Sequence, residues 1–326
     1  MNIELSAALG LRRPQRRHRL RIFIFVFLLL GVFGTNSSRF YWHQQLYHSV
    51  LQTWSSASQA TGLWLPGFVP DVVAKPIEGI EEDISGITYD YDHDRLLTIT
   101  NGGLMQIVAL DRAGNVLERY PLEGFDDTEG LAYMGNGEGL AYMGNGRVVV
   151  SEEGDQRLTF IQLPEKSATI RKGAEPFITV GVNLSTNNKG FEGVTYDPVG
   201  DRLFAIKERD PRQLYEIGGV SKSLNGNLSI NLIDRTEWVN HSFFGRDIAD
   251  AYYDPGTGHL VLLSEQSKLL IELDKEGRFV SYKSLLEGVK DFFSPNVHPE
   301  GVTMDAQGHL YVVAEPNLFY SFMRKP

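Results

Sequence analysis

Short runs of alternating apolar and polar residues recur at regular intervals from residue 85 to the carboxyl end of the chain. The stretch EGVTYDPVGDRLFAIKE at residues 192–208 returns as EGVTMDAQGHLYVVAE at residues 300–315, and looser copies begin at residues 85, 138 and 249. Successive copies therefore start 53, 54, 57 and 51 residues apart. This period is typical of one four-stranded blade of a β-propeller and is longer than that of tetratricopeptide or ankyrin repeats.

Within each copy the pattern predicts strands. A β-rich segment such as GVTY is followed by a turn of Asp, Gly, Pro or Asn and then by a second apolar run such as LFAIK. Apolar runs separated by such turn residues are typical of β-hairpins. A third run follows in every copy and a fourth in all but the last. The sequence therefore predicts an all-β chain built as a five-bladed β-propeller.

The strand that the last copy lacks is predicted to come from the start of the domain. The segment VVAKPIEG at residues 72–79 matches YPLEG and SLLEG, which supply the fourth strand of other copies. An early strand that completes the last blade would close the ring and remove its exposed edges. We therefore place the propeller at residues 71–326.

One copy contains a literal duplication. The nonapeptide EGLAYMGNG occurs at residues 129–137 and again at residues 138–146. Only one of the two can supply the inner strand in register. The second runs directly into RVVVSE, so we predict that Glu138 opens the blade strand and that residues 129–137 form a loop. Loops tolerate such insertions at small entropic cost.

The amino terminus predicts export from the cytoplasm. Residues 1–21 hold six arginines and one glutamate, and the apolar run IFIFVFLLLGVFG follows at residues 22–34. A basic region before a short apolar core is typical of an export signal, with the arginines retained on the cytoplasmic side. We expect residues 1–21 to be cytoplasmic and residues 22–34 to form a membrane-anchor helix.

Residues 35–70 are predicted to link the anchor to the propeller along the membrane. Tyr41, Leu46, Val50 and Trp54 follow a near-helical spacing, which is typical of an amphipathic interfacial segment. The protein would then be a single-pass protein of the bacterial inner membrane with its propeller in the periplasm. The alternative is a soluble periplasmic protein after signal cleavage. The chain has no cysteine, so disulfides and thiolate zinc sites are excluded.

The charge separates at the same boundary. The whole chain carries −10 and residues 1–21 carry +5, so the remainder carries −15. An acidic domain repels nucleic acid phosphates and attracts cations. Nucleic acid is therefore excluded as a partner, while the inner membrane is expected as one through the N-terminal segment.

Two polar positions recur in the aligned copies. The first opens the first strand and the second ends the next strand, and neighbouring antiparallel strands bring these two ends together. We therefore expect seven carboxylates at one mouth of the central channel: Glu138, Glu192, Glu300, Glu152, Glu208, Glu265 and Glu315. Ser85, Ala249 and Asn101 occupy the remaining positions, and Asp83 and Asp247 lie two residues upstream of the first position.

A crowded set of carboxylates must take up protons, spread apart, pair with cations or bind a metal. Clustered oxygen ligands without thiolates suit a hard divalent ion, Ca²⁺ or Mg²⁺, and Glu192, Glu300 and Glu138 are the first candidates. The alternative is that each glutamate only accepts hydrogen bonds from the adjacent blade. His298 lies two residues before Glu300, where it is either a general base or a solvated loop residue. Nucleophile motifs such as GxSxG and HExxH are absent from the sequence.

The strings GFEGVTYD, AIKERDP, DIADAYYDP and HPEGVTMDAQGHLYVVAEPNLFYSF resemble the SdiA-regulated family of bacterial envelope proteins, over about residues 72–323. The resemblance implies a five-bladed propeller behind an N-terminal membrane anchor, and it carries no catalytic residues with it. The chain departs from the family pattern in the tandem nonapeptide and in Asp250, where the family tends to have glycine.

Two classes of function remain open. The first is a non-catalytic envelope module that binds a divalent cation, and a small ligand or partner, at one mouth of the channel. The second is a metal-dependent hydrolase of phosphoesters or lactones, because acidic propellers resemble phytase-like and lactonase-like enzymes. The absence of a nucleophile motif favours the first.

Overall fold

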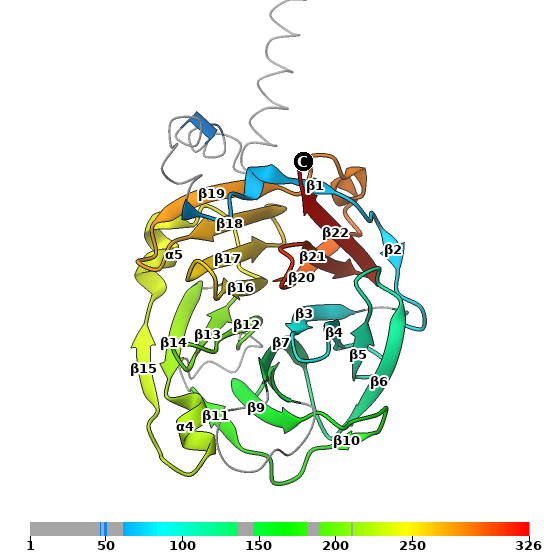
Figure 1. Ribbon diagram of the computed structural model, residues 1–326, viewed down its shortest axis with the longest axis vertical. Helices are drawn as coiled ribbons and strands as arrows, with labels where there is room; N and C mark the ends of the chain where they lie inside the picture. The colour runs from blue at the N-terminus through cyan, green and yellow to red at the C-terminus, as the bar shows by residue number, and fades with distance from the viewer. Residues whose placement is uncertain are drawn as a thin grey trace, which may run out of the picture.

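The described residues form five β-sheets around a central axis (Figure 1), which confirms the predicted five-bladed propeller. The structure is a computed structural model that describes residues 46, 49–50, 61–81, 83–135, 146–180, 190–209 and 211–325. The predicted anchor at residues 22–34 lies outside these ranges. Within them, no helix combines the length and the apolar character that a membrane crossing requires.

Each blade is built on an antiparallel sheet whose strands follow sequence order from the axis outward, except at the outer edges of blades 1 and 5. Blade 1 contains β3 (Ile84–Asp90), β4 (Arg95–Thr100), β5 (Gln106–Leu110) and β6 (Val116–Glu123), with β10 (Ile170–Arg171) added parallel to β6. Blade 2 contains β7 (Thr128–Gly135), β8 (Arg147–Glu152), β9 (Arg157–Gln162) and β11 (Phe177–Thr179). Blade 3 contains β12 (Val194–Asp197), β13 (Arg202–Lys207), β14 (Gln213–Gly218) and β15 (Asn231–Asp234).

Blades 4 and 5 complete the ring. Blade 4 contains β16 (Asp250–Asp254), β17 (His259–Ser264), β18 (Leu269–Leu273) and β19 (Phe279–Ser284). Blade 5 contains β20 (His298–Met304), β21 (Leu310–Glu315) and β22 (Leu318–Arg324), with β1 (Phe68–Pro70) and β2 (Lys75–Pro76) from the start of the domain. The short helices are η1 (Leu65–Gly67), α4 (Val220–Leu224), α5 (Thr236–Ser242) and η2 (Lys290–Phe293).

The ring is closed by the early part of the chain, as predicted. Both β1 and β2 pair antiparallel with β22, so the first strands of the domain form the outer edge of the last blade. Closure begins earlier than the sequence suggests, because β1 lies within the predicted linker of residues 35–70. Residues 72–79, the predicted closing strand, contribute only the two residues of β2. Asn317, of the AEPN string, holds this segment by accepting a hydrogen bond from Ile77 N at 2.9 Å.

A buried carboxylate fixes the closing segment, which we define as residues 61–81. Glu272 on β18 is fully buried, and its two oxygens accept hydrogen bonds from Leu63 N at 2.7 Å and Trp64 N at 3.1 Å. Ser281 Oγ donates to the same carboxylate, and His259 Nδ1 lies 2.7 Å from it. The segment is therefore held to blade 4 before its strands reach blade 5.

The inner strands pack closely around the axis because a glycine faces the next blade. Each inner strand contacts the inner strands on both sides. A Cβ on Gly130 would lie 2.4 Å from the carbonyl oxygen of Glu192, a distance that real Cβ atoms do not reach. The equivalent glycines of other blades are Gly86, Gly193 and Gly301. Close contact between the backbones of neighbouring inner strands, more than side-chain packing, therefore sets the width of the central channel.

Substituting Gly130 with alanine should lower the free energy of unfolding by about 1–3 kcal/mol, because the new methyl group forces the inner strands of blades 2 and 3 apart. The matched control is Gly173→Ala, since a Cβ on Gly173 meets only the Glu175 carboxylate, at 3.8 Å. Urea denaturation followed by circular dichroism measures both. Equal midpoints for the two variants would contradict close backbone packing at the axis.

The structure corrects the prediction for the tandem nonapeptide. The first copy forms β7, so Glu129 occupies the position predicted for Glu138. Glu138 itself lies outside the described residues. The first copy is selected by the residues that precede it: Glu153 N donates to Asp127 O at 2.9 Å, and Thr128 Oγ1 donates to Thr100 O at 3.0 Å. The second copy has no comparable Asp and Thr before it.

Candidate functional site

The two recurring polar positions meet at one mouth of the channel. The start of each inner strand lies beside the end of its partner, as Asn101 N donating to Asp83 O at 2.9 Å shows in blade 1. The same bond joins Glu153 to Asp127 in blade 2, and blade 5 pairs Glu315 with His298. Side chains from all five blades therefore converge near the axis.

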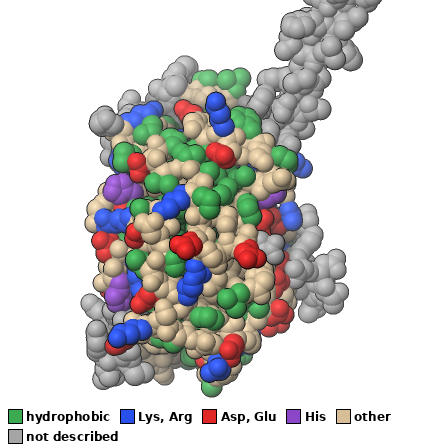
Figure 2. All heavy atoms as spheres, turned by 90° about the vertical axis from the view of Figure 1, so that its right-hand side faces the viewer, with side chains coloured by type: hydrophobic (Ala, Val, Ile, Leu, Met, Phe, Trp, Pro, Cys, Tyr) green, Lys and Arg blue, Asp and Glu red, His purple; other side chains and the backbone are tan. Residues whose placement is uncertain are grey.

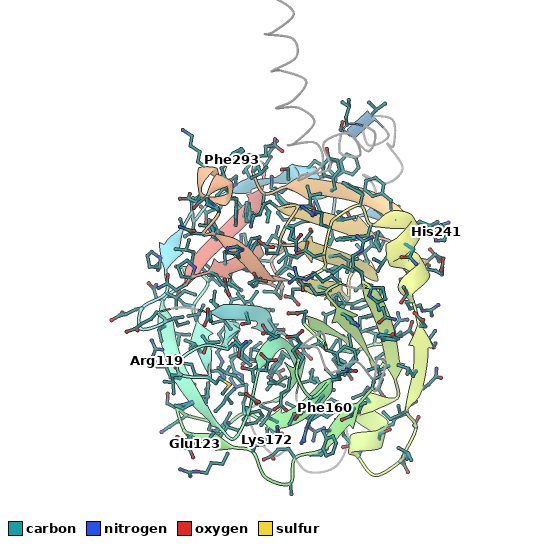
Figure 3. The ribbon with its side chains drawn as sticks, turned by 180° about the vertical axis from the view of Figure 1, so that it is seen from behind. Arg119, Glu123, Phe160, Lys172, His241 and Phe293 are labelled. Carbon is teal, nitrogen blue, oxygen red and sulfur yellow. The ribbon has the colours of Figure 1, made fainter. Side chains whose placement is uncertain are left out.

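The structure also corrects the second position in blade 2, which is Glu153 and not Glu152. Glu152 is the last residue of β8, and its side chain turns into the protein, where it is fully buried. It accepts a hydrogen bond from Thr159 Oγ1 at 2.6 Å and pairs with Lys172, which lies toward the outside of the ring (Figure 3). Glu152 is therefore a structural ion-pair residue.

We call the converging groups the acidic ring. Five of its glutamates were predicted from the sequence, namely Glu192, Glu208, Glu265, Glu300 and Glu315, and two replace predicted residues, namely Glu129 and Glu153. Further members are Asp83, Asp127, Asp247, Asn101 and His298. Carboxylates of different blades repel one another. The ionisation of each ring carboxylate therefore depends on that of the others.

The blade 2 part of the ring is an all-oxygen cluster. Asp127, Glu129 and Glu153 each offer a carboxylate oxygen, and these atoms lie within 4.8 Å of one another. The Asn101 amide from blade 1 donates to Glu129 Oε1 at 2.6 Å and to Asp127 Oδ1 at 3.2 Å. Turning this amide over would present its oxygen to the same point.

The blade 5 part of the ring includes a histidine. One donor atom each from His298, Glu300 and Glu315 lies within 4.8 Å of the others. His298 Nδ1 is also 2.7 Å from Glu265 Oε1, which accepts a hydrogen bond from Lys268 Nζ at 2.9 Å. His298, which the sequence left open as a solvated loop residue, therefore belongs to the ring.

Burial and mutual repulsion disturb the titration of the ring. Burial, followed by the nearby Asp127 and Glu153 carboxylates, raises the pKa of Glu129 to about 8. Burial and four ring glutamates raise the pKa of Glu192 well above its usual range. Glu300 is half-buried, and burial followed by the nearby Glu265 carboxylate raises its pKa well above its usual range.

The remaining ring glutamates differ in how far a cation compensates them. Burial raises the pKa of Glu208 to about 7, although Arg209, 2.9 Å away, opposes the shift. Burial would also raise the pKa of Glu265, but Lys268 and then His298 hold it below its usual value. Lys268 and His298 thus outweigh the burial of Glu265 in blade 4, whereas Arg209 only partly offsets the burial of Glu208 in blade 3.

Two aspartates of blade 4 serve the fold. Asp247 is fully buried and accepts hydrogen bonds from Ser264 Oγ at 2.5 Å and from Gln266 N at 3.1 Å. Asp250 stands where other blades have glycine, and its Oδ2 accepts a hydrogen bond from Val302 N of blade 5 at 2.9 Å. Burial raises the pKa of Asp250 well above its usual range. The Asp250 carboxyl group thus connects the inner strands of blades 4 and 5, whereas a glycine at this position in the other blades lets the two backbones pack directly.

A hollow of about 470 Å³ lies at the outer edge of blade 1, remote from the acidic ring. Glu78, Gly79, Leu104, Gln106, Val116 and Arg119 line it. Arg119, which points outward from β6 (Figure 3), directs its guanidinium to the carbonyl oxygens of Glu78 and Gly79 and to Gln106 Oε1. Much of the Arg119 guanidinium is therefore engaged by the protein itself.

Fold and site together define a five-bladed propeller with an acidic channel mouth. Residues 60–323 match the SdiA-regulated family, and the chain belongs to this family. Among solved structures, a chain of a nidogen/laminin complex is similar with a TM-score of 0.43 and 11% identity, covering 76% of this chain and 84% of that chain. A luciferin-regenerating enzyme is similar with a TM-score of 0.45 and 14% identity, covering 79% and 81%.

Proposed function

We propose that the propeller binds divalent cations, Ca²⁺ or Mg²⁺, at the acidic mouth of its channel. The observation that carries the proposal is the pair of clusters in which three donor atoms lie within 4.8 Å of one another. Ca²⁺ takes oxygen ligands at about 2.3–2.6 Å, so two ligands of one ion lie at most about 5 Å apart. Each cluster meets this limit without rearrangement of the backbone.

The electrostatics of the ring favour a cation. Burial, followed by repulsion from neighbouring carboxylates, raises the pKa values of Glu129, Glu192 and Glu300, and the nearby basic groups do not offset this rise. The described bases that lower the pKa of ring carboxylates are Lys268, Arg209 and His298, all on the side of blades 3 to 5. A divalent ion beside Glu129 would supply the charge that blade 2 lacks.

The two clusters suit different ions. Asp127, Glu129 and Glu153 offer only oxygen, which suits Ca²⁺ or Mg²⁺, and an Asn101 oxygen would add a neutral ligand. The cluster at Glu300 and Glu315 adds an imidazole, which first-row transition ions prefer. We therefore assign the alkaline-earth ion to the blade 2 cluster.

We further propose that the propeller works on the periplasmic side of the bacterial inner membrane, tethered by residues 22–34. The basic region before this apolar run supports the orientation. In that compartment the ring would respond to free divalent ions and present a bound ion, with its open coordination positions, to a small anionic ligand or an envelope partner.

Without divalent ions, the propeller should lose stability as the pH rises. Folded-state pKa values above the unfolded value of about 4.5 give stability that is present at low pH and lost as the pH rises through the folded values. For Glu208 and Glu129 these values are about 7 and about 8. Thermal unfolding in chelator should therefore show a midpoint that falls between about pH 5 and about pH 8 and then levels off.

Added Ca²⁺ should remove most of this decline, because the bound ion replaces the protons. Glu208→Gln is the control that shows how much of the decline with pH comes from a single residue. It removes one titrating group from blade 3 and leaves the blade 2 cluster intact. A midpoint that rises with pH in chelator would show that the ring carboxylates are ionised and compensated without a metal.

A further inference from the structure

Exposed apolar side chains gather at the end of the ring where the closing segment enters. Phe293 is 60% exposed and Met323 is 39% exposed, and Leu46 and Val50 are 65% and 47% exposed. They belong to η2, the end of β22 and the described helical residues 46, 49 and 50, which we call the helical segment. All three elements lie at the upper end of Figure 1, and Figure 3 places Phe293 there from behind. Hydrophobic side chains are visible at the same end in Figure 2.

The helical segment contacts the propeller through Ser49. Ser49 is hydrogen-bonded to the hydroxyl of Tyr282 on β19 of blade 4. Leu46 and Val50 are four residues apart, the spacing that places two side chains on one face of a helix, and both side chains are exposed. A helix that turns its polar side to the protein and its apolar side outward is typical of a membrane interface.

The second apolar group is held rigidly by the core. Phe292, next to Phe293, is buried and stacks on Tyr320 with ring centroids 4.6 Å apart. This contact fixes η2 and presents Phe293 to solvent. Met323 lies opposite Val69 in the β22 and β1 pair.

This end of the ring is neutral in an otherwise acidic domain. Among the described residues of this end, the exposed charged ones are three basic and three acidic, namely Lys290, Arg324, Lys325, Asp71, Glu287 and Asp291. The chain after residue 21 carries −15 in total. Anionic lipid headgroups therefore repel the rest of the propeller surface more than this end.

We propose that this end of the propeller rests on the surface of the phospholipid bilayer, with Phe293, Met323 and the Leu46 and Val50 face in the headgroup layer. The inference depends on the membrane location proposed above. Only the 11 residues 35–45 separate the predicted anchor from the docked helical segment. Even fully extended they span at most about 40 Å, which keeps this end near the bilayer.

The orientation has a consequence for the acidic ring. The apolar end lies on the perimeter of the propeller (Figure 1), so contact there sets the channel axis parallel to the bilayer. The acidic mouth then opens to the side. Ions and ligands reach it from solvent without passing the lipid surface.

Single cysteines test this contact directly because the chain has none of its own. Full-length F293C and M323C proteins, labelled with an environment-sensitive fluorophore, are placed in phosphatidylglycerol-containing nanodiscs with nitroxide-labelled headgroups. The matched controls are V199C and L228C on blade 3, where the native side chains are 86% and 89% exposed. We expect quenching at positions 293 and 323 to exceed that at the controls several-fold.

The result is interpreted together with alkaline carbonate extraction of the same chain from membranes. Retention with strong quenching at positions 293 and 323 supports the orientation. Retention with equal quenching at all four positions overturns it and leaves the proposed location intact. Release of the chain by carbonate overturns the membrane anchor itself, which is a separate claim.

Discussion

Replacing Glu129 with glutamine should weaken Ca²⁺ binding by about 10- to 100-fold, whereas the same replacement at Glu138 should leave it unchanged. The two glutamates open identical nonapeptides and differ only in the residues that precede them. Among the described residues, Glu129 lies beside Asp127 and Glu153 in the ring. Glutamine keeps the size of the side chain and removes its charge, so the difference measures the carboxylate alone.

Calorimetric titration of both variants with CaCl₂ provides the measurement, with thermal unfolding in chelator as a check on folding. Glu129→Gln should unfold at an equal or higher temperature than the parent at pH 8, since it removes a repelled carboxylate. If Glu138→Gln is the variant that loses Ca²⁺, the second nonapeptide supplies the ligand. If neither variant changes affinity, the blade 2 cluster does not bind the ion.

Replacing Glu272 with alanine should lower the free energy of unfolding by about 3–5 kcal/mol, because it leaves buried donors without an acceptor. Leu63 N, Trp64 N and Ser281 Oγ all donate to this carboxylate. The loss should be concentrated in the closing segment, whose backbone amides should exchange with solvent faster than those of blades 2 and 3.

The matched control is Glu276→Ala in the next turn of the same blade. Glu276 is exposed and pairs only with exposed groups, so its removal should change stability by less than about 1 kcal/mol. Urea denaturation and hydrogen exchange measure both effects. A similar small change for both variants would mean that the closing segment is held by apolar contacts and not by Glu272.

The architecture could be predicted from the sequence because blade repeats are local. Each hairpin has its own turn residues, as in the turn after β12, where Asp197 Oδ1 accepts hydrogen bonds from Val199 N and Gly200 N. The spacing of the copies then fixes the number of blades. Closure of the ring by an early strand could also be predicted. The main closing strand is Phe68–Pro70, however, and three residues are too few to show an alternating hydrophobic pattern.

The predictions of two ring residues, Glu138 and Glu152, were wrong for different physical reasons. Glu138 was chosen over Glu129 by its continuity with the next strand, but the DTEG string at residues 127–130 matches DISG at residues 83–86 and could have identified the first copy. Glu152 and Glu153 are adjacent, and a one-residue shift moves a side chain to the opposite face of the sheet. The strand end that decides between them is set by the Asp127 to Glu153 hydrogen bond, which sequence alone does not show.

The repeated sequence pattern predicted neither the basic partners of the ring carboxylates nor the histidine of the ring. Lys268 compensates Glu265 in blade 4, and the other blades have no equivalent lysine in their aligned strings. His298 enters the ring because blade 5 pairs its position with Glu315. These contacts depend on how neighbouring blades meet, so they are properties of the closed ring and not of one copy.

The central claim is that a proton-holding acidic ring binds a divalent cation, and proton-linked calorimetry tests it most directly. Ca²⁺ is titrated into the protein at pH 7 in two buffers with different heats of ionisation, which counts the protons released. We predict saturable binding with release of at least about one proton per ion, because Glu129 is largely protonated before binding. Absence of binding at millimolar Ca²⁺, or binding without proton release, would contradict the account.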